Sequence, residues 1–263
     1  MRAIILAAGE GSRLRPYTND KPKCMVMLAG RPILEYQLQA IKSVGIQEII
    51  IVTGYYFQNL ENLGLLTVHN PHFKETGMVY SLMSAKKYLD GTQDLIISYA
   101  DIVYERRILQ KLIESKGEIC VCVDEQWKDL WQLRMDDPLQ DAETFKMNTQ
   151  REILELGKVP KTYDDIEGQY IGLIKVAKTR VPQLVKIFEN YPPEMMFEGL
   201  ERNKMYMTSF LQNLIDSGIK IIAVPFKHGW LEIDTCKDLN LYNRMVKENT
   251  LSKFFDHHSF SKK

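Results

Sequence analysis

A glycine turn followed by cations, close to the start of the sequence, has the composition of a polyphosphate-binding loop. Gly9 and Gly11 come directly after an apolar run at residues 3–8, and Arg13 and Lys23 follow shortly behind them. Glycines let the backbone approach a ligand closely and leave its N–H groups free to point at oxygen anions. The basic side chains add positive charge next to the hydrogen-bond donors of the backbone, and an anionic ligand needs both. The loop therefore predicts a site for a nucleoside triphosphate.

Two better-known glycine loops do not fit this stretch. A dinucleotide-binding fingerprint would need a third glycine at position 14, where the sequence has Leu14. The spacing of a P-loop, in which a lysine and a hydroxyl residue follow the second glycine, does not occur here. An NAD-binding Rossmann domain is therefore disfavoured.

Arg13 and Lys23 are the candidates for catalysis on a triphosphate. A guanidinium grips phosphate oxygens with two donors, so we expect Arg13 to hold the β- and γ-phosphates. We expect Lys23 to lie between the α-phosphate and the anion of an acceptor, where it would offset the repulsion between two negatively charged reactants. The residues point to positioning and charge stabilisation, without a covalent intermediate.

Three carboxylates are predicted to hold a metal ion. Asp101 directly follows an apolar strand, and Glu232 and Asp234 alternate along a short strand, so that both side chains share one face. Mg²⁺ is a hard cation that takes oxygen ligands, often one or two protein carboxylates together with phosphates and water. The three residues together predict a Mg²⁺ site that spans the two halves of the chain.

The spacing of apolar residues predicts an α/β fold around these side chains. Buried strands are expected at residues 3–8, 48–53, 65–69, 94–101 and 118–124, with helices at residues 32–44, 58–63, 78–89 and 105–116. Strands that alternate with helices predict a Rossmann-like, doubly wound and mostly parallel mixed sheet. Ligands bind at the carboxyl ends of such strands, where the glycine loop and Asp101 both fall.

The second half of the chain has a different character. Residues 127–142 are polar, aromatic and proline-containing, and are expected to form an inserted loop. A hairpin is expected at residues 143–146 and 152–156. Strands are then expected at residues 168–177, 220–226 and 229–234, and helices at residues 179–191, 205–217 and 238–249. The tail, residues 257–263, is expected to be frayed or packed on a neighbour.

Charge and composition exclude several classes of partner. Lys and Arg number 34, as do Asp and Glu, so no net charge draws the chain to nucleic acid or to a membrane surface. No apolar run is long enough to span a membrane, and the start of the sequence is not expected to be a signal peptide. The four cysteines are scattered, which favours reduced thiols and a cytoplasmic protein.

Several motifs together resemble a known enzyme family. The opening L-A-A-G-E-G-S-R-L with the later K-P-K, the strand-end Asp101, and W-L-E-I-D-T at residues 230–235 look like a cytidylyltransferase of the phosphocholine type. Narrower markers at residues 126–145, 153–157 and 165–172 look like the branch that acts on aminoalkylphosphonates or on phosphorylated amino acids such as glutamine phosphate. The resemblance covers nearly the whole chain and implies a nucleotide-diphospho-sugar transferase-like fold.

The resemblance also implies substrates, a cofactor and a division of the chain. CTP and Mg²⁺ would be used, pyrophosphate would be released, and the product would be a precursor of a cell-surface polysaccharide or lipid. The chain is expected to be a single nucleotidyltransferase domain, residues 1–263. Residues 1–125 would bind nucleotide, residues 126–235 would bind the acceptor, and residues 236–263 would form a C-terminal helix and tail.

By the same resemblance, the nucleotide meets the glycine loop and one later helix. Residues 76–82, with Ser81, would line the cytosine pocket, although the family often has an asparagine where Gly77 stands. The backbone of Leu6 and Ala8 would contact the base or ribose. The expected nucleotide-binding residues are Leu6, Ala8, Gly9, Glu10, Gly11, Ser12, Arg13, Tyr80, Ser81 and Asp101. The alternative for Tyr80 and Ser81 is helix packing.

The acceptor pocket is expected further along the chain. Trp127 and Trp131 are four residues apart, which on a helical turn puts both on one face. Their rings could hold an ammonium group by cation–π attraction, or could anchor a loop or a subunit contact. Arg134, Glu167 and Tyr170 are the polar candidates nearby. Both an aromatic box for trimethylammonium and paired charges for an amino acid stay open.

Two other functions remain as alternatives. A sugar-1-phosphate nucleotidyltransferase using another nucleotide would share the loop and the carboxylates. A non-catalytic nucleotide-binding regulatory module would share the fold. In each case the partners would be small molecules, and a homodimer is possible.

Overall fold

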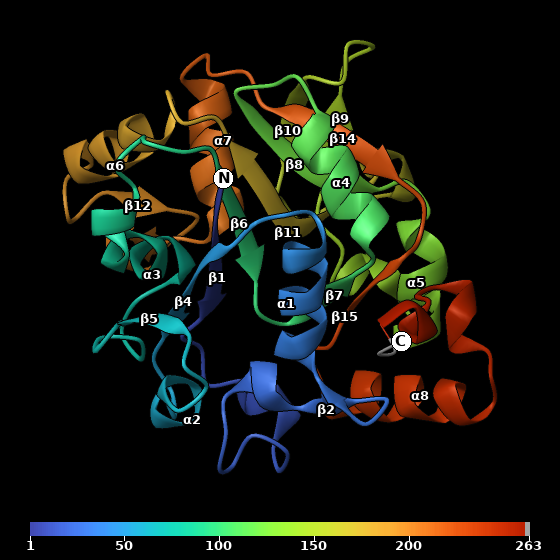
Figure 1. Ribbon diagram of the computed structural model, residues 1–263. Coiled ribbons are helices and arrows are strands. Elements are labelled where there is room, and N and C mark those ends of the chain that lie inside the picture. Colours follow the sequence, from blue (N-terminus) through green and yellow to red (C-terminus); the bar gives the residue numbers. More distant parts are fainter. Residues whose placement is uncertain (261–263) are drawn as a thin grey trace.

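A twisted sheet organises the computed structural model, which describes residues 1–260. This part of the chain forms a seven-stranded sheet with β1 near its middle (Figure 1). In sheet order the strands are β14 (Ile222–Phe226), β8 (Ile119–Asp124), β11 (Gln169–Val176), β6 (Leu95–Tyr99), β1 (Arg2–Ala7), β4 (Glu48–Thr53) and β5 (Leu66–His69). β11 pairs antiparallel to both of its neighbours, and the other pairings are parallel. The predicted mixed, mostly parallel α/β sheet is confirmed.

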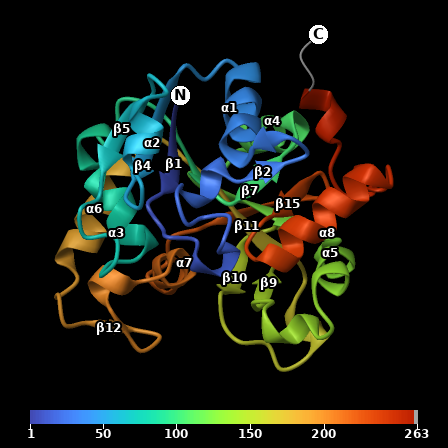
Figure 2. The same ribbon diagram turned by 90° about the horizontal axis from the view of Figure 1, so that it is seen from below.

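Helices cover both faces of this sheet, so it has a core on each side (Figure 2). Along β1, Ala3 and Ile5 enter one core while Ile4 and Leu6 enter the other, as the alternation of side chains along a strand requires. The helices are α1 (Ile33–Ser43), α2 (Gln58–Glu61), α3 (Met78–Ser84), α4 (Arg106–Glu114), α5 (Trp127–Arg134), α6 (Val181–Asn190), α7 (Met207–Asp216) and α8 (Cys236–Lys247). The length and apolar content needed to cross a membrane are not found in any helix of residues 1–260.

Short strand pairs lie outside the main sheet. The hairpin of β9 (Phe145–Met147) and β10 (Ile153–Leu156) confirms the prediction for that segment. Two smaller pairs are β2 (Met27–Leu28) with β3 (Arg31–Pro32), and β12 (Met196–Phe197) with β13 (Leu200–Glu201). The sequence analysis did not predict β2, β3, β12 or β13, because two or three residues carry no measurable periodicity.

The pair that matters most for the site joins β7 (Ile102–Tyr104) to β15 (Trp230–Glu232). They run antiparallel, with Ile102 opposite Glu232, and the Ile233 amide donates to the Asp101 carbonyl at 2.9 Å. β7 was not predicted, because the expected strand ended at Asp101 and the chain reverses there into a new short strand. The pairing brings Asp101 and Asp234 to the same edge of the molecule.

The segment 127–142 was wrongly predicted to be a loop. Its first half is helix α5, in which Trp127, Leu130 and Trp131 form a buried face with i, i+3, i+4 spacing. The polar residues between them, which suggested a loop, lie on the other side of a short amphipathic helix. Only the part that follows, around a turn at Pro138–Gln140, is irregular.

The C-terminal segment is packed rather than frayed as far as it is described. Phe260 is buried, and its ring meets that of Tyr36 edge-on with centroids 5.1 Å apart. The remaining part of the predicted tail, residues 261–263, lies outside the described residues. The packing of Phe260 therefore ties the end of the chain to α1.

Gly172 sits at a break in the regular pairing of β11. The register between β11 and β8 shifts between Tyr170 and Ile174, and Gly172 has a φ of +79°. A Cβ atom at this position would overlap the Tyr99 ring on β6. The glycine therefore lets Tyr99 lie against the strand.

We predict that Gly172→Ala lowers the free energy of unfolding by roughly 2–5 kcal/mol. Alanine is strained in the left-handed backbone conformation, and its Cβ would also displace the Tyr99 ring. Gly199→Ala is a matched control, because Gly199 has a similar φ of +82° but nothing within 4 Å of the added Cβ. It should lose only about 1–2 kcal/mol. Urea unfolding of the three proteins measures both values, and equal losses in the two variants would contradict the role given to Tyr99.

Candidate active site

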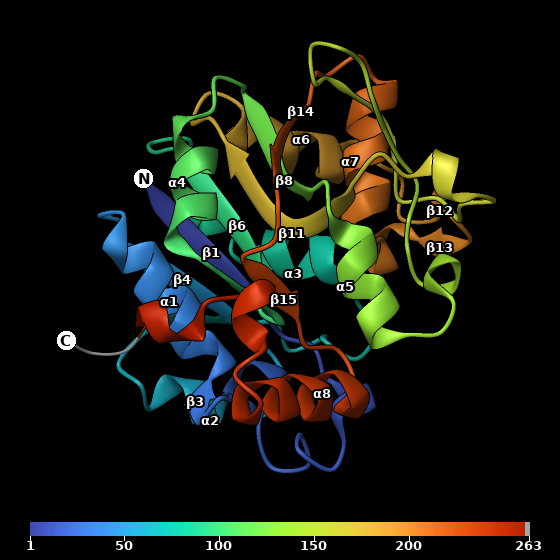
Figure 3. The same cartoon turned by 90° about the vertical axis from the view of Figure 1, so that its right-hand side faces the viewer.

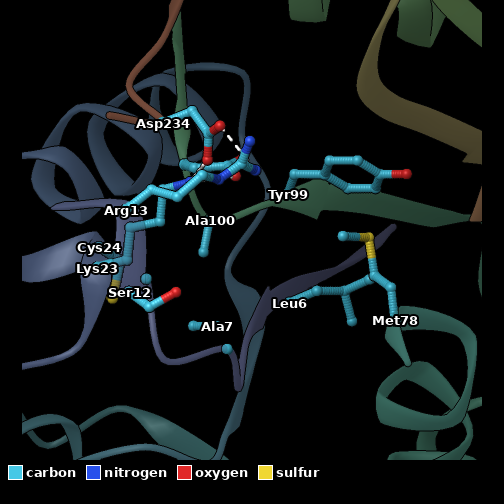
Figure 4. A pocket seen from close by; sticks show the side chains of 13 residues that line it. Leu6, Ala7, Ser12, Arg13, Lys23, Cys24, Met78, Tyr99, Ala100 and Asp234 are labelled. Carbon is cyan, nitrogen blue, oxygen red and sulfur yellow. Dashed lines mark hydrogen bonds and ion pairs between the residues drawn. The ribbon is translucent and has the colours of Figure 1, made fainter. Parts of the chain in front are cut away.

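A cavity of about 250 Å³ lies at the carboxyl ends of β1 and β6, where the glycine loop leaves the sheet. Its lining is made of Leu6, Ala7, Gly9, Gly11, Ser12, Arg13, Lys23, Cys24, Met78, Tyr99, Ala100, Asp101 and Asp234. Figure 4 shows Arg13 joined to Asp234 on one side, with Tyr99 and Met78 across from them. The cavity thus contains most of the predicted loop, both predicted catalytic cations and two of the three predicted metal ligands.

Gly11 is required where the loop packs against Lys23. Its φ is +61°, and a Cβ there would lie 2.9 Å from the Lys23 Cβ. The Thr18 hydroxyl donates to the Gly11 carbonyl at 2.9 Å, which holds the turn closed. Any larger residue at position 11 would displace the base of the Lys23 side chain.

Lys23 lies between two carboxylates. Its Nζ is 2.8 Å from Asp101 Oδ2 and 2.7 Å from Asp234 Oδ1, and Arg13 Nη2 is 2.7 Å from Asp234 Oδ2. Burial by itself would lower the pKa of Lys23, but attraction to the two carboxylates outweighs it, and the net shift is upward. Lys23 is therefore held as a cation.

Asp101 and Asp234 have the chemistry of a divalent-metal site. Asp101 Oδ1 is buried and has no hydrogen-bond partner among residues 1–260. A buried oxygen in that state is costly unless it meets a donor or a cation. Both residues offer the hard oxygen atoms that Mg²⁺ prefers, so the pair fits such an ion.

Glu232, the third predicted ligand, is held by a different partner. Its Oε2 lies 2.8 Å from Arg134 Nη1, and the Arg134 Nε lies 3.0 Å from Asp238 Oδ1. Burial, with repulsion from Asp101 and Asp234, raises the pKa of Glu232 to about 7 although Arg134 opposes the shift. Among the described residues, no group of three or more His, Cys, Asp or Glu is arranged to hold a metal ion.

Arg134 joins three elements beside the cavity. It comes from α5, its side chain is 2% exposed, and it reaches both β15 through Glu232 and the first turn of α8 through Asp238. Figure 3 shows α5 and α8 next to one another with β15 beside them. Arg134 is not among the residues that line the first cavity, and its contacts fix the strand that carries Glu232 and leads to Asp234. Its part in acceptor binding stays a prediction.

A second cavity, of about 260 Å³, adjoins the first. Arg13, Met78, Tyr99 and Asp234 line both. The rest of its lining consists of Trp131, Asp141, Glu143, Gln169, Tyr170, Ile171, Gly172, Tyr206, Met207, Thr208, Trp230 and Glu232. Trp131 and Tyr170 were predicted acceptor residues and do line it.

Asp141, Glu143 and Gln169 were not predicted individually as site residues, although all three fall within the family markers at residues 126–145 and 165–172. Each reaches the cavity through the geometry of a turn, the β9–β10 hairpin or the irregular start of β11. Their position depends on tertiary packing that periodicity does not report.

Two predicted acceptor residues lie elsewhere. Trp127 is 4% exposed and packs between Trp131 and Tyr163, outside both cavities. The Glu167 carboxylate accepts a hydrogen bond from the Met147 amide at 2.9 Å and so holds the hairpin. Neither residue lines the first or the second cavity, and acceptor binding by them stays a prediction.

Four predicted nucleotide-binding residues do not line the first cavity. Glu10 pairs with Arg15 at 3.5 Å, and Ala8 is buried under the loop. The Ser81 hydroxyl donates to the Gly77 carbonyl at 3.2 Å and accepts from Asn70 at 3.0 Å. Tyr80, the fourth, follows Met78 along α3. It is Met78 from this helix that faces the cavity.

Gly77 has a packing reason for lacking a side chain. A Cβ there would lie 2.6 Å from the Lys204 carbonyl group, and the Gly77 amide donates to the Asn203 carbonyl at 2.7 Å. An asparagine, which the resembling family often carries, does not fit at this position. The start of α3 is instead joined to the segment that leads into α7.

Cys24 lines the first cavity without being a nucleophile. It is 1% exposed, and burial raises the pKa of its thiol to about 12. A thiol with that pKa holds its proton at neutral pH, and the thiolate is the reactive form. All four cysteines are free.

We predict that Arg134→Met lowers the free energy of unfolding by about 3–5 kcal/mol, because it leaves Glu232 and Asp238 without their cation. The double variant Arg134→Met/Glu232→Gln should regain part of the loss, since one unpaired carboxylate is then neutral. Chemical denaturation of the wild type and both variants tests this. A single variant as stable as the wild type would show that Arg134 does not hold these elements together.

Known proteins resemble this chain in sequence and in fold. Residues 3–164 match the MobA-like NTP transferase domain family. A CTP:phosphoglutamine cytidylyltransferase from Campylobacter jejuni is 44% identical over 250 residues, which cover 92% of this chain and 98% of that protein.

Two solved structures share the fold. An inositol-1-phosphate CTP transferase from T. maritima has a TM-score of 0.73 at 22% identity, over 97% of both chains. The CTP:phosphocholine cytidylyltransferase from Streptococcus pneumoniae has a TM-score of 0.69 at 21% identity, over 93% of this chain and 98% of that one. At these identities the likeness shows the fold alone.

The sequence matches extend across most of the chain, and the overall fold is shared with the solved structures. This chain belongs to the MobA-like NTP transferase family and is a nucleotidyltransferase with the nucleotide-diphospho-sugar transferase fold.

Proposed function

We propose that the enzyme transfers a cytidylyl group from CTP to a small phosphorylated or phosphonylated acceptor, and releases pyrophosphate. The observation that carries this proposal is Lys23, a largely buried cation of the first cavity that pairs with Asp101 and with Asp234, and Asp234 also lines the second cavity. The relative that is 44% identical supports CTP as the donor and a phosphoglutamine-like acceptor. An aminoalkylphosphonate and phosphocholine are the other acceptors of this class.

The first cavity would take the nucleotide. Gly9, Gly11 and Ser12 present backbone to it, and the Arg13 side chain, 66% exposed, can turn from Asp234 to the β- and γ-phosphates. The backbone at Leu6 and the side chain of Met78 would meet the base or ribose. Residues 1–125 would thus bind the nucleotide and residues 126–235 the acceptor, within a single domain.

Asp101 and Asp234 would hold Mg²⁺, which when bound would neutralise charge on the triphosphate. The Lys23 ammonium lies beside both carboxylates, where its Nζ would meet oxygens of the α-phosphate and of the acceptor.

The transfer would be a direct displacement. An oxygen of the acceptor phosphate forms a bond to the α-phosphorus of CTP, and the bond between that phosphorus and the oxygen bridging to the β-phosphate breaks. Pyrophosphate leaves with the bonding electrons. The acceptor oxygen is already an anion, so Lys23 has charge to neutralise and no proton to remove.

The cellular compartment, the use of the product and the oligomeric state are further parts of the proposal. Four free cysteines suit a reducing compartment, and we propose the cytoplasm. The product would be an activated precursor of a cell-surface polysaccharide or lipid. The homodimer stays a prediction of the sequence.

Pyrophosphate release from each of CTP, UTP, dTTP and GTP, with a panel of acceptors, tests the proposed function. We expect CTP with phosphoglutamine to be fastest, and chelation by EDTA to abolish turnover until Mg²⁺ is restored. Faster turnover of a sugar 1-phosphate would favour the sugar-nucleotide alternative. Binding of CTP without turnover of any acceptor would favour a regulatory module.

Lys23→Ala should lower kcat by at least ~100-fold, as loss of a group that stabilises transition-state charge does in other enzymes. Lys21→Ala is the matched control, because Lys21 lies 3.7 Å from Asp20 and contributes nothing to the cavity. It should keep kcat within about twofold, because an exposed ion pair contributes little. Circular dichroism and Tm confirm that each variant is folded, and a fully active Lys23→Ala would overturn the role given to this lysine.

A further inference from the structure

We propose that Glu143 determines the choice of acceptor by binding its ammonium group, with Asp141 and the Trp131 indole beside it. The inference rests on the proposed cytidylyl transfer and adds to it the residue that recognises the end of the acceptor remote from phosphorus. Nothing in the residue spacing or in the relatives' names assigns this role to Glu143.

The charges of the second cavity are unbalanced at one end. Asp234 has Lys23 and Arg13 as partners, and Glu232 has Arg134. Glu143 and Asp141 line the same cavity, and no cation of residues 1–260 forms an ion pair with either of them. The second cavity therefore has unpaired negative charge at the end lined by Glu143 and Asp141.

The backbone of Glu143 is fixed by a buried side chain. Gln169, which is 4% exposed, donates from Nε2 to the Glu143 carbonyl at 2.5 Å and accepts from the Glu143 amide at 3.1 Å. These two hydrogen bonds attach the Glu143 backbone to β11 at the cavity wall. These bonds fix the point on the cavity wall from which the Glu143 side chain starts, so its backbone has little freedom left to lose on binding.

The same carboxylate is in an unfavourable environment without a ligand. Burial, followed by repulsion from Glu198, Glu232 and Asp141, raises the pKa of Glu143 to about 7. Arg13 is the cation that lines this cavity, and it is committed to Asp234. An ammonium group placed beside Glu143 would supply the missing counter-charge.

The cavity suits a primary ammonium better than a quaternary one. Asp141 accepts from Trp131 Nε1 at 3.1 Å, which orients both the carboxylate and the ring. A primary ammonium donates three hydrogen bonds, which carboxylates accept, whereas a trimethylammonium group donates none. Trp131 and Trp230, with ring centroids 6.1 Å apart, add aromatic surface next to these acceptors.

The test compares 3-aminopropylphosphonate with butylphosphonate, in which a methyl group replaces the ammonium, using the full chain with CTP and Mg²⁺. We expect kcat/KM to be about 10- to 100-fold higher for the amine, the value of a hydrogen bond to a charged group. Glu143→Gln should raise KM for 3-aminopropylphosphonate by a similar factor and leave KM for CTP unchanged. The ratio of kcat/KM between 3-aminopropylphosphonate and butylphosphonate should therefore become smaller. Glu194→Gln, which removes a carboxylate from the exposed surface, should change none of these values.

A folding measurement separates recognition from a structural role. Because the folded-state pKa of Glu143 is raised above its ordinary value, its ionisation destabilises the fold progressively as pH rises toward 7. At pH 8 the Tm of Glu143→Gln should therefore be no lower than that of the wild type. The difference in Tm, variant minus wild type, should be larger at pH 8 than at pH 5. A Tm that falls at both pH values would show that Glu143 supports the fold instead.

The results of these experiments distinguish a failure of the proposed cytidylyl transfer from a failure of the role given to Glu143. If CTP releases pyrophosphate with none of the phosphorylated or phosphonylated acceptors, the proposed cytidylyl transfer is wrong. If pyrophosphate is released but butylphosphonate matches the amine, or Glu143→Gln keeps the KM of the wild type for the amine, the transfer stands and the role of Glu143 is wrong. A preference for phosphocholine that Glu143→Gln does not alter would also overturn it.

Discussion

The ion pairs of Lys23 with Asp101 and Asp234 are the interaction on which the arrangement of this site depends. A lysine taken out of water is stable as a cation only where opposite charge is close, and here two carboxylates lie within 2.8 Å of its nitrogen. The three residues come from distant parts of the chain. They meet because β7 pairs with β15 and because Gly11 leaves room for the lysine.

The acceptor side depends on a second set of buried polar contacts. Arg134 binds β15 to α8, and Gln169 binds Glu143 to β11. Arg134 lies outside both cavities and holds the Glu232 carboxylate, whereas Gln169 lines the second cavity and holds the Glu143 backbone. In both cases a buried polar side chain positions a residue that carries a carboxylate.

Sequence patterns predicted the parts of the molecule that local chemistry determines. The apolar runs of β1, β4 and β6 and the turn from Gly9 to Arg13 carry their signals within a few residues, and the main sheet agrees with them. The glycine loop and Asp101 could be expected side by side because the carboxyl ends of parallel strands meet at one edge of a sheet, and Asp234 was joined to Asp101 as a predicted metal ligand.

Other features could not be predicted in this way. β7 is too short to have a period, and the helical face of α5 is hidden among polar residues. Trp127 and Trp131 were correctly placed on one face, but packing sends Trp127 to the core and leaves Trp131 at the cavity. Glu143 reaches the cavity through a hairpin and a buried glutamine, a tertiary relationship that spacing does not contain.

The wall shared by the two cavities has a stereochemical consequence. Arg13, Met78, Tyr99 and Asp234 border both spaces, so the two substrates can lie end to end in one trough, and the thiol of Cys24 is buried and protonated. The proposed transfer in such a ternary complex would be a single in-line attack, with the incoming and departing oxygens on opposite sides of the phosphorus. It would invert the configuration at that phosphorus in the product.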